Sequence, residues 1–257
     1  MLPSYSMMAA RPAPRLFAGS PEMCGHRGCG RGVVDGHMEN TLGSCLAAAA
    51  AGLRWLELDA RLTADGVLVA HHDPRVADGR DVAALSADQT DALGIARLAD
   101  LLRELPAEVS LDLEVKTALE DALRPADETT AAHVARLADP ESGRRRILVT
   151  SFDAAAVTIV RDRAPSLPLG LITWFGFPLR KGVPAAVHLG AQVLAAEVSS
   201  FPLDQPAEAA RLVDVAHRAG LEVLGWCPTA DEVDRLAAAG VDCLVIDDVL
   251  GVRSIET

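Results

Sequence analysis

The chain has 257 residues, half of them hydrophobic, and its 24 basic against 36 acidic residues give a formal net charge of −12. This length allows one large domain with a sizeable core, which alanine, leucine and valine must build because aromatic residues make up only 4%. The acidic balance argues against nucleic acid as a partner, since nucleic-acid binding requires a basic face.

The first twenty residues are rich in proline and arginine and lack a continuous apolar stretch of signal-peptide length. We therefore predict a disordered N-terminal tail over residues 1–20 and a single domain over residues 21–257. No run of about 20 apolar residues indicates a membrane span, and no basic amphipathic helix indicates docking on a bilayer. We accordingly expect no stable membrane association.

The five cysteines are scattered along the chain and form no C-x-x-C pair. This pattern argues against a disulfide framework or a zinc cluster, and it predicts buried free thiols in a reducing compartment. We therefore expect a cytoplasmic location.

Extended and helical patterns alternate along the chain. The first half contains predicted strands at 22–26, 54–59, 67–70 and 109–116, and predicted helices at 41–51 and 98–105. Residues 74–94 show no clear period and are interpreted as a partly helical loop insertion. The second half contains predicted strands at 146–150, 167–173, 192–196, 221–226 and 241–246. The predicted helices of this half are 127–138, 153–163, a short helix ending at 189, 206–219 and a last one from Thr229.

About eight strands that alternate with helices predict a parallel sheet. Eight such units indicate a closed (β/α)8 TIM barrel, here in a single domain with a short insertion after the second strand. An open doubly wound sheet is the alternative fold. Such a sheet would normally carry a glycine-rich GxGxxG phosphate loop, and the chain lacks one. Active sites of (β/α)8 barrels lie at the C-terminal ends of the strands.

Acidic side chains alternate with apolar ones in two of the predicted strands. Glu57 and Asp59 are two residues apart, so they project to the same side. Two neighbouring carboxylates repel each other unless a proton or a cation lies between them, and oxygen ligands favour a hard divalent cation. Asp112, Glu114 and Lys116 likewise share one face of the strand at 109–116.

Several short motifs occur in a characteristic order. They are HRG at 26–28, ENT at 39–41, ELD at 57–59, HHD at 71–73 and LEVK at 113–116. In this order and spacing the chain resembles the glycerophosphodiester phosphodiesterase family over roughly residues 24–248. Later segments, ILVTSFD at 147–153 and GLEVLGW at 220–226, are also similar to that family. The resemblance implies a (β/α)8 barrel and a phosphoric diester hydrolase that forms glycerol 3-phosphate and an alcohol.

The resemblance also implies roles for individual residues. The implied ligands of one divalent cation, Mg²⁺ or Ca²⁺, are Glu39, Glu57, Asp59 and Glu114. The implied catalytic residues are His26 and His72. The implied substrate-binding residues are Arg27 and Lys116 at the phosphate, Asn40 beside the metal and Trp226 at the glycerol pocket. A cation and two basic side chains would neutralise the phosphodiester and its transition state, while two imidazoles would divide the proton transfers.

The expected partner is a small-molecule glycerophosphodiester. The nucleophile is either a glycerol hydroxyl of the substrate, which would give a cyclic phosphate, or water. Two alternatives remain open: a phospholipase D-like relative that cleaves lysophospholipids through a cyclic phosphate, and a non-catalytic barrel that binds phosphoesters. The glycine-rich loop at 29–38, between HRG and ENT, is long.

Overall fold

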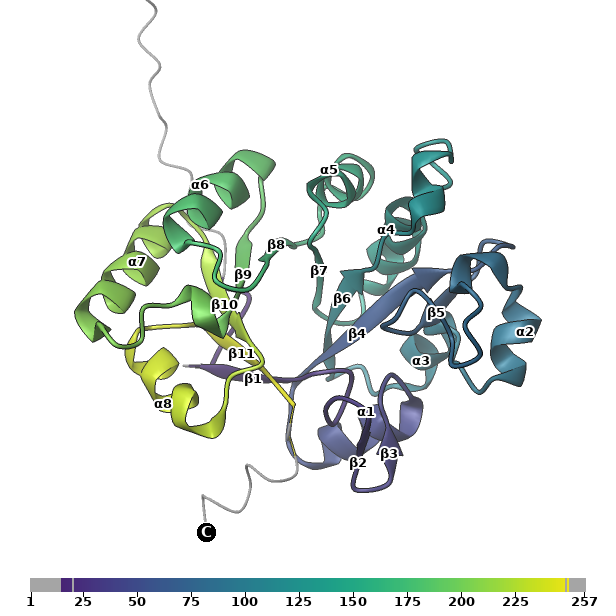
Figure 1. Ribbon diagram of the computed structural model, residues 1–257, viewed down its shortest axis with the longest axis horizontal. Coiled ribbons are helices and arrows are strands. Elements are labelled where there is room, and N and C mark those ends of the chain that lie inside the picture. The colour runs from purple at the N-terminus through teal and green to yellow at the C-terminus, as the bar shows by residue number, and fades with distance from the viewer. Residues whose placement is uncertain (1–14, 20, 248, 250–257) are drawn as a thin grey trace, which may run out of the picture.

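The computed structural model describes residues 15–19, 21–247 and 249, and it shows a closed barrel of parallel strands surrounded by helices (Figure 1). The barrel strands follow the order β1 (Glu22–Gly25), β4 (Trp55–Leu62), β6 (Ser110–Val115), β7 (Ile147–Ser151), β8 (Leu169–Thr173), β9 (Val193–Glu197), β10 (Glu222–Trp226) and β11 (Cys243–Ile246). The barrel closes because β1 pairs in parallel with both β11 and β4. This closure confirms the predicted (β/α)8 barrel and excludes an open sheet.

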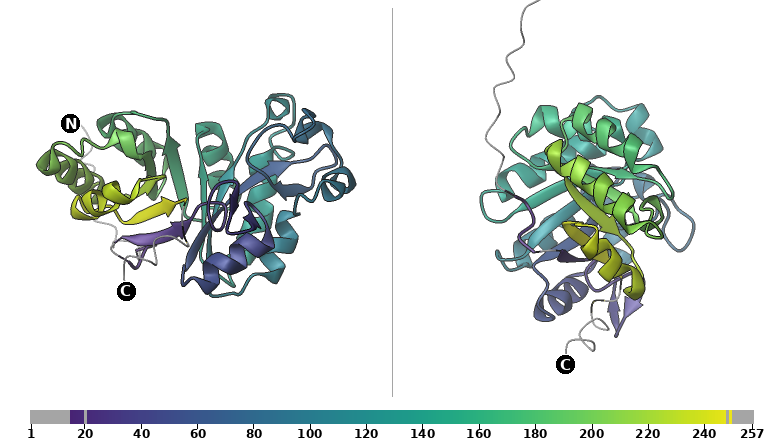
Figure 2. Two further views of the ribbon diagram at one scale, coloured as in Figure 1. Left: turned by 60° about the horizontal axis from the view of Figure 1, so that its bottom comes forward. Right: turned by 90° about the vertical axis from the view of Figure 1, so that its left-hand side faces the viewer.

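Helices connect the strands and cover the outside of the barrel. They are α1 (Leu42–Ala50), α3 (Leu98–Glu104), α4 (Thr130–Glu141), α5 (Ala154–Arg163), α6 (Leu179–Leu189), α7 (Pro206–Arg218) and α8 (Ala230–Ala238). Helices α6, α7 and α8 lie side by side on one flank (Figure 2). Among the described residues, no helix combines the length and the apolar character needed to cross a membrane.

The alternation of side chains along the strands divides the core into two layers. Leu56 and Leu58 of β4 point outward and pack with the helices. Trp55 of the same strand points inward and packs with residues such as Leu148 and Leu224 in the lower part of the barrel. Glu57 and Asp59 also point inward, but they lie higher, toward the C-terminal strand ends. The barrel interior is therefore apolar toward the N-terminal ends of the strands and acidic toward their C-terminal ends.

The predicted insertion after the second barrel strand is present. β5 (Leu68–Ala70), which pairs antiparallel with β4, precedes it, and the predicted range 74–94 contains the 3₁₀ helix η1 (Val82–Ala84) and α2 (Ala87–Ala92). These elements lie outside the ring of strands (Figure 1). The antiparallel return of β5 places residues 71–73 beside the end of β4, because the His71 amide donates to the Asp59 carbonyl oxygen over 3.1 Å.

The segment after β1, predicted as a glycine-rich loop, contains a small hairpin. Its strands are β2 (Val33–Val34) and β3 (His37–Met38). The turn residues Asp35 and Gly36 have φ angles of 47° and 82°, and an Asp-Gly pair with two positive φ angles matches the type I′ turn of two-residue hairpins.

The predicted disordered tail does not extend over all of residues 1–20. Residues 1–14 and 20 lie outside the described part of the chain, but residues 15–19 pack against the barrel. The Phe17 side chain is only 1% exposed, and its ring centroid lies 5.1 Å from that of Trp55 at the lower end of the barrel. The amides of Leu16 and Phe17 donate to the Glu222 carboxylate over 2.6 and 3.1 Å. This segment therefore belongs to the domain.

Candidate active site

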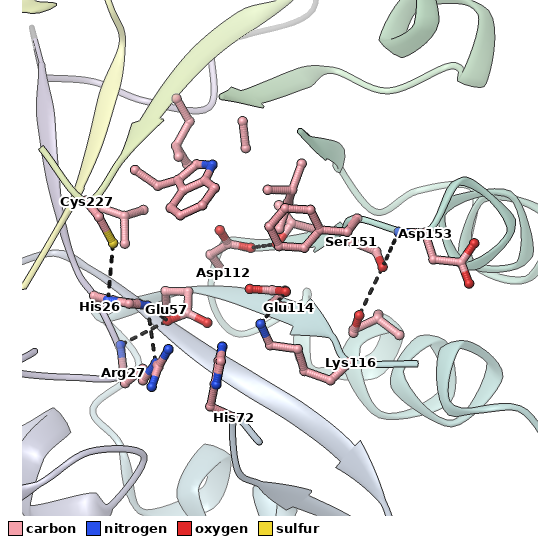
Figure 3. Close-up of a pocket in the computed structure, with 18 of the residues that line it drawn as sticks. His26, Arg27, Glu57, His72, Asp112, Glu114, Lys116, Ser151, Asp153 and Cys227 are labelled. Atoms are coloured by element: carbon pink, nitrogen blue, oxygen red, sulfur yellow. Dashed lines mark hydrogen bonds and ion pairs between the residues drawn. The ribbon is translucent and has the colours of Figure 1, made fainter. Parts of the chain in front are cut away.

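A pocket of about 610 Å³ opens at the C-terminal ends of the strands. Figure 3 shows Glu57 and Glu114 between His26 and Lys116, with His72 approaching from a neighbouring loop. Side chains from β4, β6, β7, β8, β9, β10 and β11 line this pocket, and His26 and Arg27 join them from the segment just after β1. The structure thus brings together residues that are far apart in the chain: His26 and Cys227, which both line the pocket, are separated by 201 positions.

Three carboxylates converge on one point beneath the pocket. Strand register places Asp59 of β4 beside Glu114 of β6, one step above the pair formed by Glu57 and Asp112. Oxygen atoms of Glu57, Asp59 and Glu114 lie within 4.8 Å of one another, and all three residues are buried. Glu57 Oε1 has no hydrogen bond or ion pair, whereas Asp59 Oδ1 and Glu114 Oε1 both lie beside Lys116 Nζ. Buried carboxylate oxygens left without hydrogen bonds suit a hard divalent cation.

The charges of these carboxylates are coupled. Burial, together with the charges of Asp59 and Glu114, raises the pKa of Glu57 well above its usual range. Burial also raises the pKa of Glu114 to about 7 and that of Asp112 to about 8. Burial alone would raise the pKa of Asp59 too, but Lys116 and Arg27 outweigh it and hold that pKa at about 2. Among these carboxylates, Asp59 is therefore the one that stays ionised at neutral pH without a bound cation.

Two basic side chains border the carboxylates. Lys116 Nζ lies 2.5 Å from Glu114 Oε1 and 3.1 Å from Asp59 Oδ1. Burial would lower the pKa of Lys116, but Asp59, Glu114 and Glu57 outweigh it and raise that pKa. Arg27 Nε lies 3.3 Å from Asp59 Oδ2. Both cations can therefore approach an anionic ligand in the pocket while they partly neutralise the acidic cluster.

Glu39, predicted as a fourth metal ligand, lies outside the three-carboxylate group. Its oxygens accept hydrogen bonds from Arg27 Nη1 over 2.9 and 3.0 Å, and from the Gly32 amide over 2.5 Å. These contacts turn the carboxylate toward the guanidinium and the loop after β1. In this structure the Glu39 carboxylate holds Arg27 in place, and its role as a metal ligand stays a prediction.

Asn40, predicted to bind substrate, is buried behind Asp59 and does not line the pocket. Its Nδ2 donates to Asp59 Oδ2 over 2.8 Å, and its Oδ1 accepts from the Asp59 amide over 3.2 Å. The Asn40 amide also donates to the Arg27 carbonyl oxygen over 2.9 Å. Arg27 and Asn40 both have positive φ angles, 51° and 56°, which are uncommon for non-glycine residues and concentrate at functional sites. The geometry makes Asn40 a residue that orients Asp59.

His26 follows β1 and is oriented by an aspartate that the sequence analysis missed. Its Nδ1 lies 2.6 Å from Asp247 Oδ1, just after β11, while its Nε2 accepts from Arg27 Nε over 3.2 Å. Burial would raise the pKa of Asp247, but the hydrogen bond and charge of His26 outweigh it and lower that pKa to about 2. The parallel pairing of β1 with β11 brings these two residues together. In the sequence, the only sign of this role is that Asp247 directly follows the last predicted strand, at 241–246.

His72 has the same kind of partner. Its Nδ1 lies 2.7 Å from Asp73 Oδ1, so its Nε2 is left for the pocket, which it lines together with His26. Burial lowers the pKa of His72. The neighbouring His71 turns away, with its Nε2 3.3 Å from the Arg75 carbonyl oxygen, and it lines a different hollow.

Aromatic side chains form one wall of the pocket. The Trp226 ring lies 5.9 Å from Phe152 and 5.2 Å from Phe175, both edge-on, and Trp174 lies 4.4 Å from Phe152. Trp174 and Phe175 are 62% and 68% exposed at the pocket mouth. In a chain so poor in aromatic residues, this gathering provides an apolar surface beside the charged centre.

The chain shares this architecture with known proteins. The model of the "Glycerophosphoryl diester phosphodiesterase family" matches residues 26–250. A Mycobacterium tuberculosis protein named "Probable glycerophosphodiester phosphodiesterase 2" is 30% identical over 236 residues, which cover 81% of each chain. An Oleispira antarctica phosphodiesterase, solved in complex with sn-glycerol-3-phosphate, superposes with a TM-score of 0.74 at 23% identity, covering 92% of this chain and 97% of that one. A Thermotoga maritima glycerophosphodiester phosphodiesterase superposes with a TM-score of 0.71 at 17% sequence identity, covering 92% of this chain and 98% of that one. At these identities the two structures show the fold.

A (β/α)8 barrel of this kind, matched over most of its length by a phosphodiesterase model, is a phosphoric diester hydrolase. The chain belongs to the glycerophosphoryl diester phosphodiesterase family. The predicted family is thereby confirmed, and the activity is that of a phosphodiesterase on glycerophosphodiesters.

Proposed function

We propose that this enzyme uses one divalent cation and two histidines to hydrolyse glycerophosphodiesters to glycerol 3-phosphate and an alcohol. The observation that carries the proposal is the convergence of three buried carboxylates between two imidazoles, each of which is oriented by an aspartate. A binding protein would need the cationic side chains but has no use for two groups placed to transfer protons.

Glu57, Asp59 and Glu114 would hold the cation, and the buried Glu57 Oε1, which has neither a hydrogen bond nor an ion pair, supports this assignment. Local charge supports it as well. With Glu39 included, four carboxylates face two basic side chains, Arg27 and Lys116, so a divalent cation would balance the group when every carboxylate is ionised. Carboxylate oxygens accept both Mg²⁺ and Ca²⁺. When bound, such a cation polarises the phosphoryl group and neutralises charge that develops in the transition state.

His26 and His72 would move the protons. In each histidine an aspartate oxygen lies within hydrogen-bond distance of Nδ1. This contact favours the tautomer with hydrogen on Nδ1 and a lone pair on Nε2. One Nε2 can accept the proton of the attacking hydroxyl, and the other, once protonated, can donate to the leaving oxygen. The attacking hydroxyl belongs to water or to the glycerol of the substrate.

Arg27 and Lys116 would bind the phosphate. Lys116 Nζ also lies 5.8 Å from the centroid of Phe152, which places it where the charged centre meets the aromatic wall. Trp226 on that wall would contact the glycerol, because a ring face packs well against the C–H groups of a small polyol. Asn40 acts through Asp59 and does not touch the substrate.

The alternative substrate class is a lysophospholipid. Its support is the exposed pair Trp174 and Phe175, which extends the apolar wall to the pocket mouth. A panel of glycerophosphodiesters and lysophospholipids, assayed with Mg²⁺ and with Ca²⁺ and analysed by ³¹P NMR, separates the two classes. Release of glycerol 3-phosphate from glycerophosphocholine supports the proposal, whereas a cyclic lipid phosphate as the sole product supports the alternative. Turnover of neither class contradicts both.

Cation binding should release protons in a pH-dependent manner. Since the pKa of Glu114 is raised to about 7 and that of Glu57 is raised further above its usual range, both carry protons below neutral pH. A cation requires the ionised carboxylates, so at pH 6 we expect release of about two protons per cation, one from each carboxyl group. The release should decline, and the affinity should rise, as pH increases through and beyond 7. Calorimetry in buffers of different ionisation enthalpy measures both. Binding without proton release at pH 6 would exclude these ligands.

A further inference from the structure

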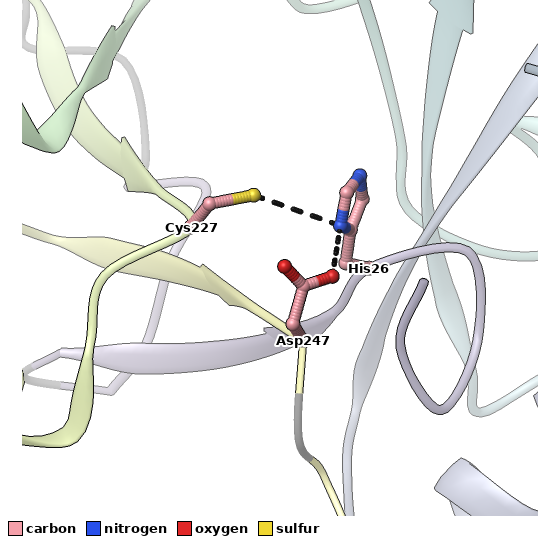
Figure 4. Close-up of side chains that lie close together, drawn as sticks. All are labelled: His26, Cys227 and Asp247. Atoms are coloured by element: carbon pink, nitrogen blue, oxygen red, sulfur yellow. Dashed lines mark hydrogen bonds and ion pairs between the residues drawn. The ribbon is translucent and has the colours of Figure 1, made fainter. Parts of the chain in front are cut away.

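A second cluster of ligand atoms surrounds the other nitrogen of His26 (Figure 4). Cys227, just after β10, places its Sγ 3.6 Å from His26 Nδ1, and Asp247 Oδ1 lies 2.6 Å from the same nitrogen. Potential ligand atoms of His26, Cys227 and Asp247 all lie within 4.8 Å of one another. The Nε2 atom of the ring points away from both partners (Figure 4).

The spacing of these atoms fits a tetrahedral centre. With ordinary zinc bond lengths, a thiolate sulfur and an imidazole nitrogen on one tetrahedral Zn²⁺ are about 3.6 Å apart, which is the distance between Cys227 Sγ and His26 Nδ1. A carboxylate oxygen and an imidazole nitrogen would be about 3.4 Å apart, so Asp247 must move outward by less than an ångström. All three residues are partly exposed, and His26 and Cys227 border the open pocket, which leaves a fourth position for water or substrate.

Cys227 is held in this position by its backbone. Its φ angle is +55°, a left-handed conformation that is unfavourable for a non-glycine residue. Its amide donates to the Val245 carbonyl oxygen over 2.9 Å, which anchors it between β10 and β11. Burial and the charge of Asp247 raise the pKa of the thiol to about 12. The free side chain is therefore a neutral thiol, and a soft cation would have to displace its proton.

We propose that His26, Cys227 and Asp247 form a binding site for a soft divalent cation of the Zn²⁺ type, separate from the three carboxylates. On binding, the Cys227 S–H bond breaks, its proton passes to solvent and the thiolate coordinates the metal. His26 coordinates through Nδ1, so the neutral ring carries its hydrogen on Nε2 and can no longer accept a proton there. Occupancy would therefore inhibit the enzyme, and this consequence rests on the proposed role of His26.

The two sites would select different metals. The three carboxylates offer oxygen ligands alone, which suit Mg²⁺ or Ca²⁺, whereas a thiolate and an imidazole suit Zn²⁺. Arg31 opposes cation binding at the new site, because its Nη2 lies 3.8 Å from Asp247 Oδ2. Arg31 is well exposed, so its replacement should leave the ligands in place and tighten zinc binding.

Cobalt spectroscopy tests the site independently of activity. Co²⁺ added to the enzyme with excess Mg²⁺ should produce a thiolate-to-cobalt charge-transfer band, and Zn²⁺ should bleach it. Cys227→Ser should lack the band. The matched control is Cys45→Ala, which removes a buried thiol on α1 that does not line the pocket and should keep the band. Arg31→Ala should need less Co²⁺ for half-saturation than the unmodified enzyme.

Inhibition by Zn²⁺ is then measured against the zinc-free activity of each protein. We expect the half-inhibiting Zn²⁺ concentration to rise by at least about tenfold in Cys227→Ser, from the loss of one of three protein ligands. A folded enzyme without the band, or a band that persists in Cys227→Ser, overturns the site. A Cys227-dependent band without inhibition confirms the site and contradicts the proposed role of His26, so the two failures can be told apart.

Discussion

Asp59→Asn should abolish most of the activity and the response to divalent cations. The change removes the carboxylate that stays ionised, with a pKa of about 2, while it keeps the shape and an oxygen that can accept from Asn40 Nδ2. Loss of a ligand and of a buried charge at the reacting group should lower kcat by about 10³-fold. In the unmodified enzyme, EDTA should remove activity and Mg²⁺ or Ca²⁺ should restore it. The cation should also raise Tm in the unmodified enzyme and not in Asp59→Asn, because a ligand stabilises only the state that binds it.

Glu197→Gln is the matched control for this substitution. Glu197 is also a buried carboxylate at a strand end, but it accepts from the Ser199 amide over 2.7 Å and lies outside the three-carboxylate group. We expect this variant to keep both activity and the cation-dependent rise in Tm. If Asp59→Asn kept the same Tm shift and turned over at the normal rate, the proposed metal ligands would be wrong.

The acidic centre could be predicted from sequence because its geometry is local. Glu57 and Asp59 project together through the alternation of one strand, and parallel pairing at the same level adds Glu114. The elements themselves were also predictable, since apolar strands and amphipathic helices alternate throughout. Sequence patterns do not predict the direction of a side chain where a loop sets it. Glu39 lies in a motif next to Asn40, yet the loop after β1 turns its carboxylate toward Arg27 and Gly32.

Contacts between side chains that are far apart in the sequence could not be predicted from it. Asp247 meets His26 across 221 positions, and only the closure of the barrel between β1 and β11 brings them together. Likewise, the spacing of the cysteines along the chain gives no sign that Cys227 lies beside His26 and Asp247 in space. Phe17 follows a proline-rich stretch with no periodicity, so its packing on Trp55 depends on a barrel end that must form first.

His72→Ala should lower kcat by about 10² to 10⁴-fold, the usual contribution of a positioned general acid or base. The imidazole lines the pocket, its Nδ1 is engaged by Asp73, and its Nε2 is free to exchange a proton. The substrate phosphate would still be held by Arg27 and Lys116, so KM should change much less than kcat. Steady-state kinetics on glycerophosphocholine measure both constants. Added imidazole should restore part of the rate, because a small base can enter the space left by the side chain, and a purely structural role would not respond to it.

His71→Ala provides a control one position away. His71 belongs to the same loop and has the same chemistry, but its ring faces the Arg75 carbonyl oxygen and a hollow outside the pocket. Its removal should leave kcat within a few-fold of the unmodified enzyme and should give no response to imidazole. Because the two substitutions delete identical groups from adjacent positions, a general disturbance of the loop would affect both alike. Equal losses in the two variants would therefore contradict proton transfer by His72, and a loss confined to His71→Ala would assign that role to the other ring.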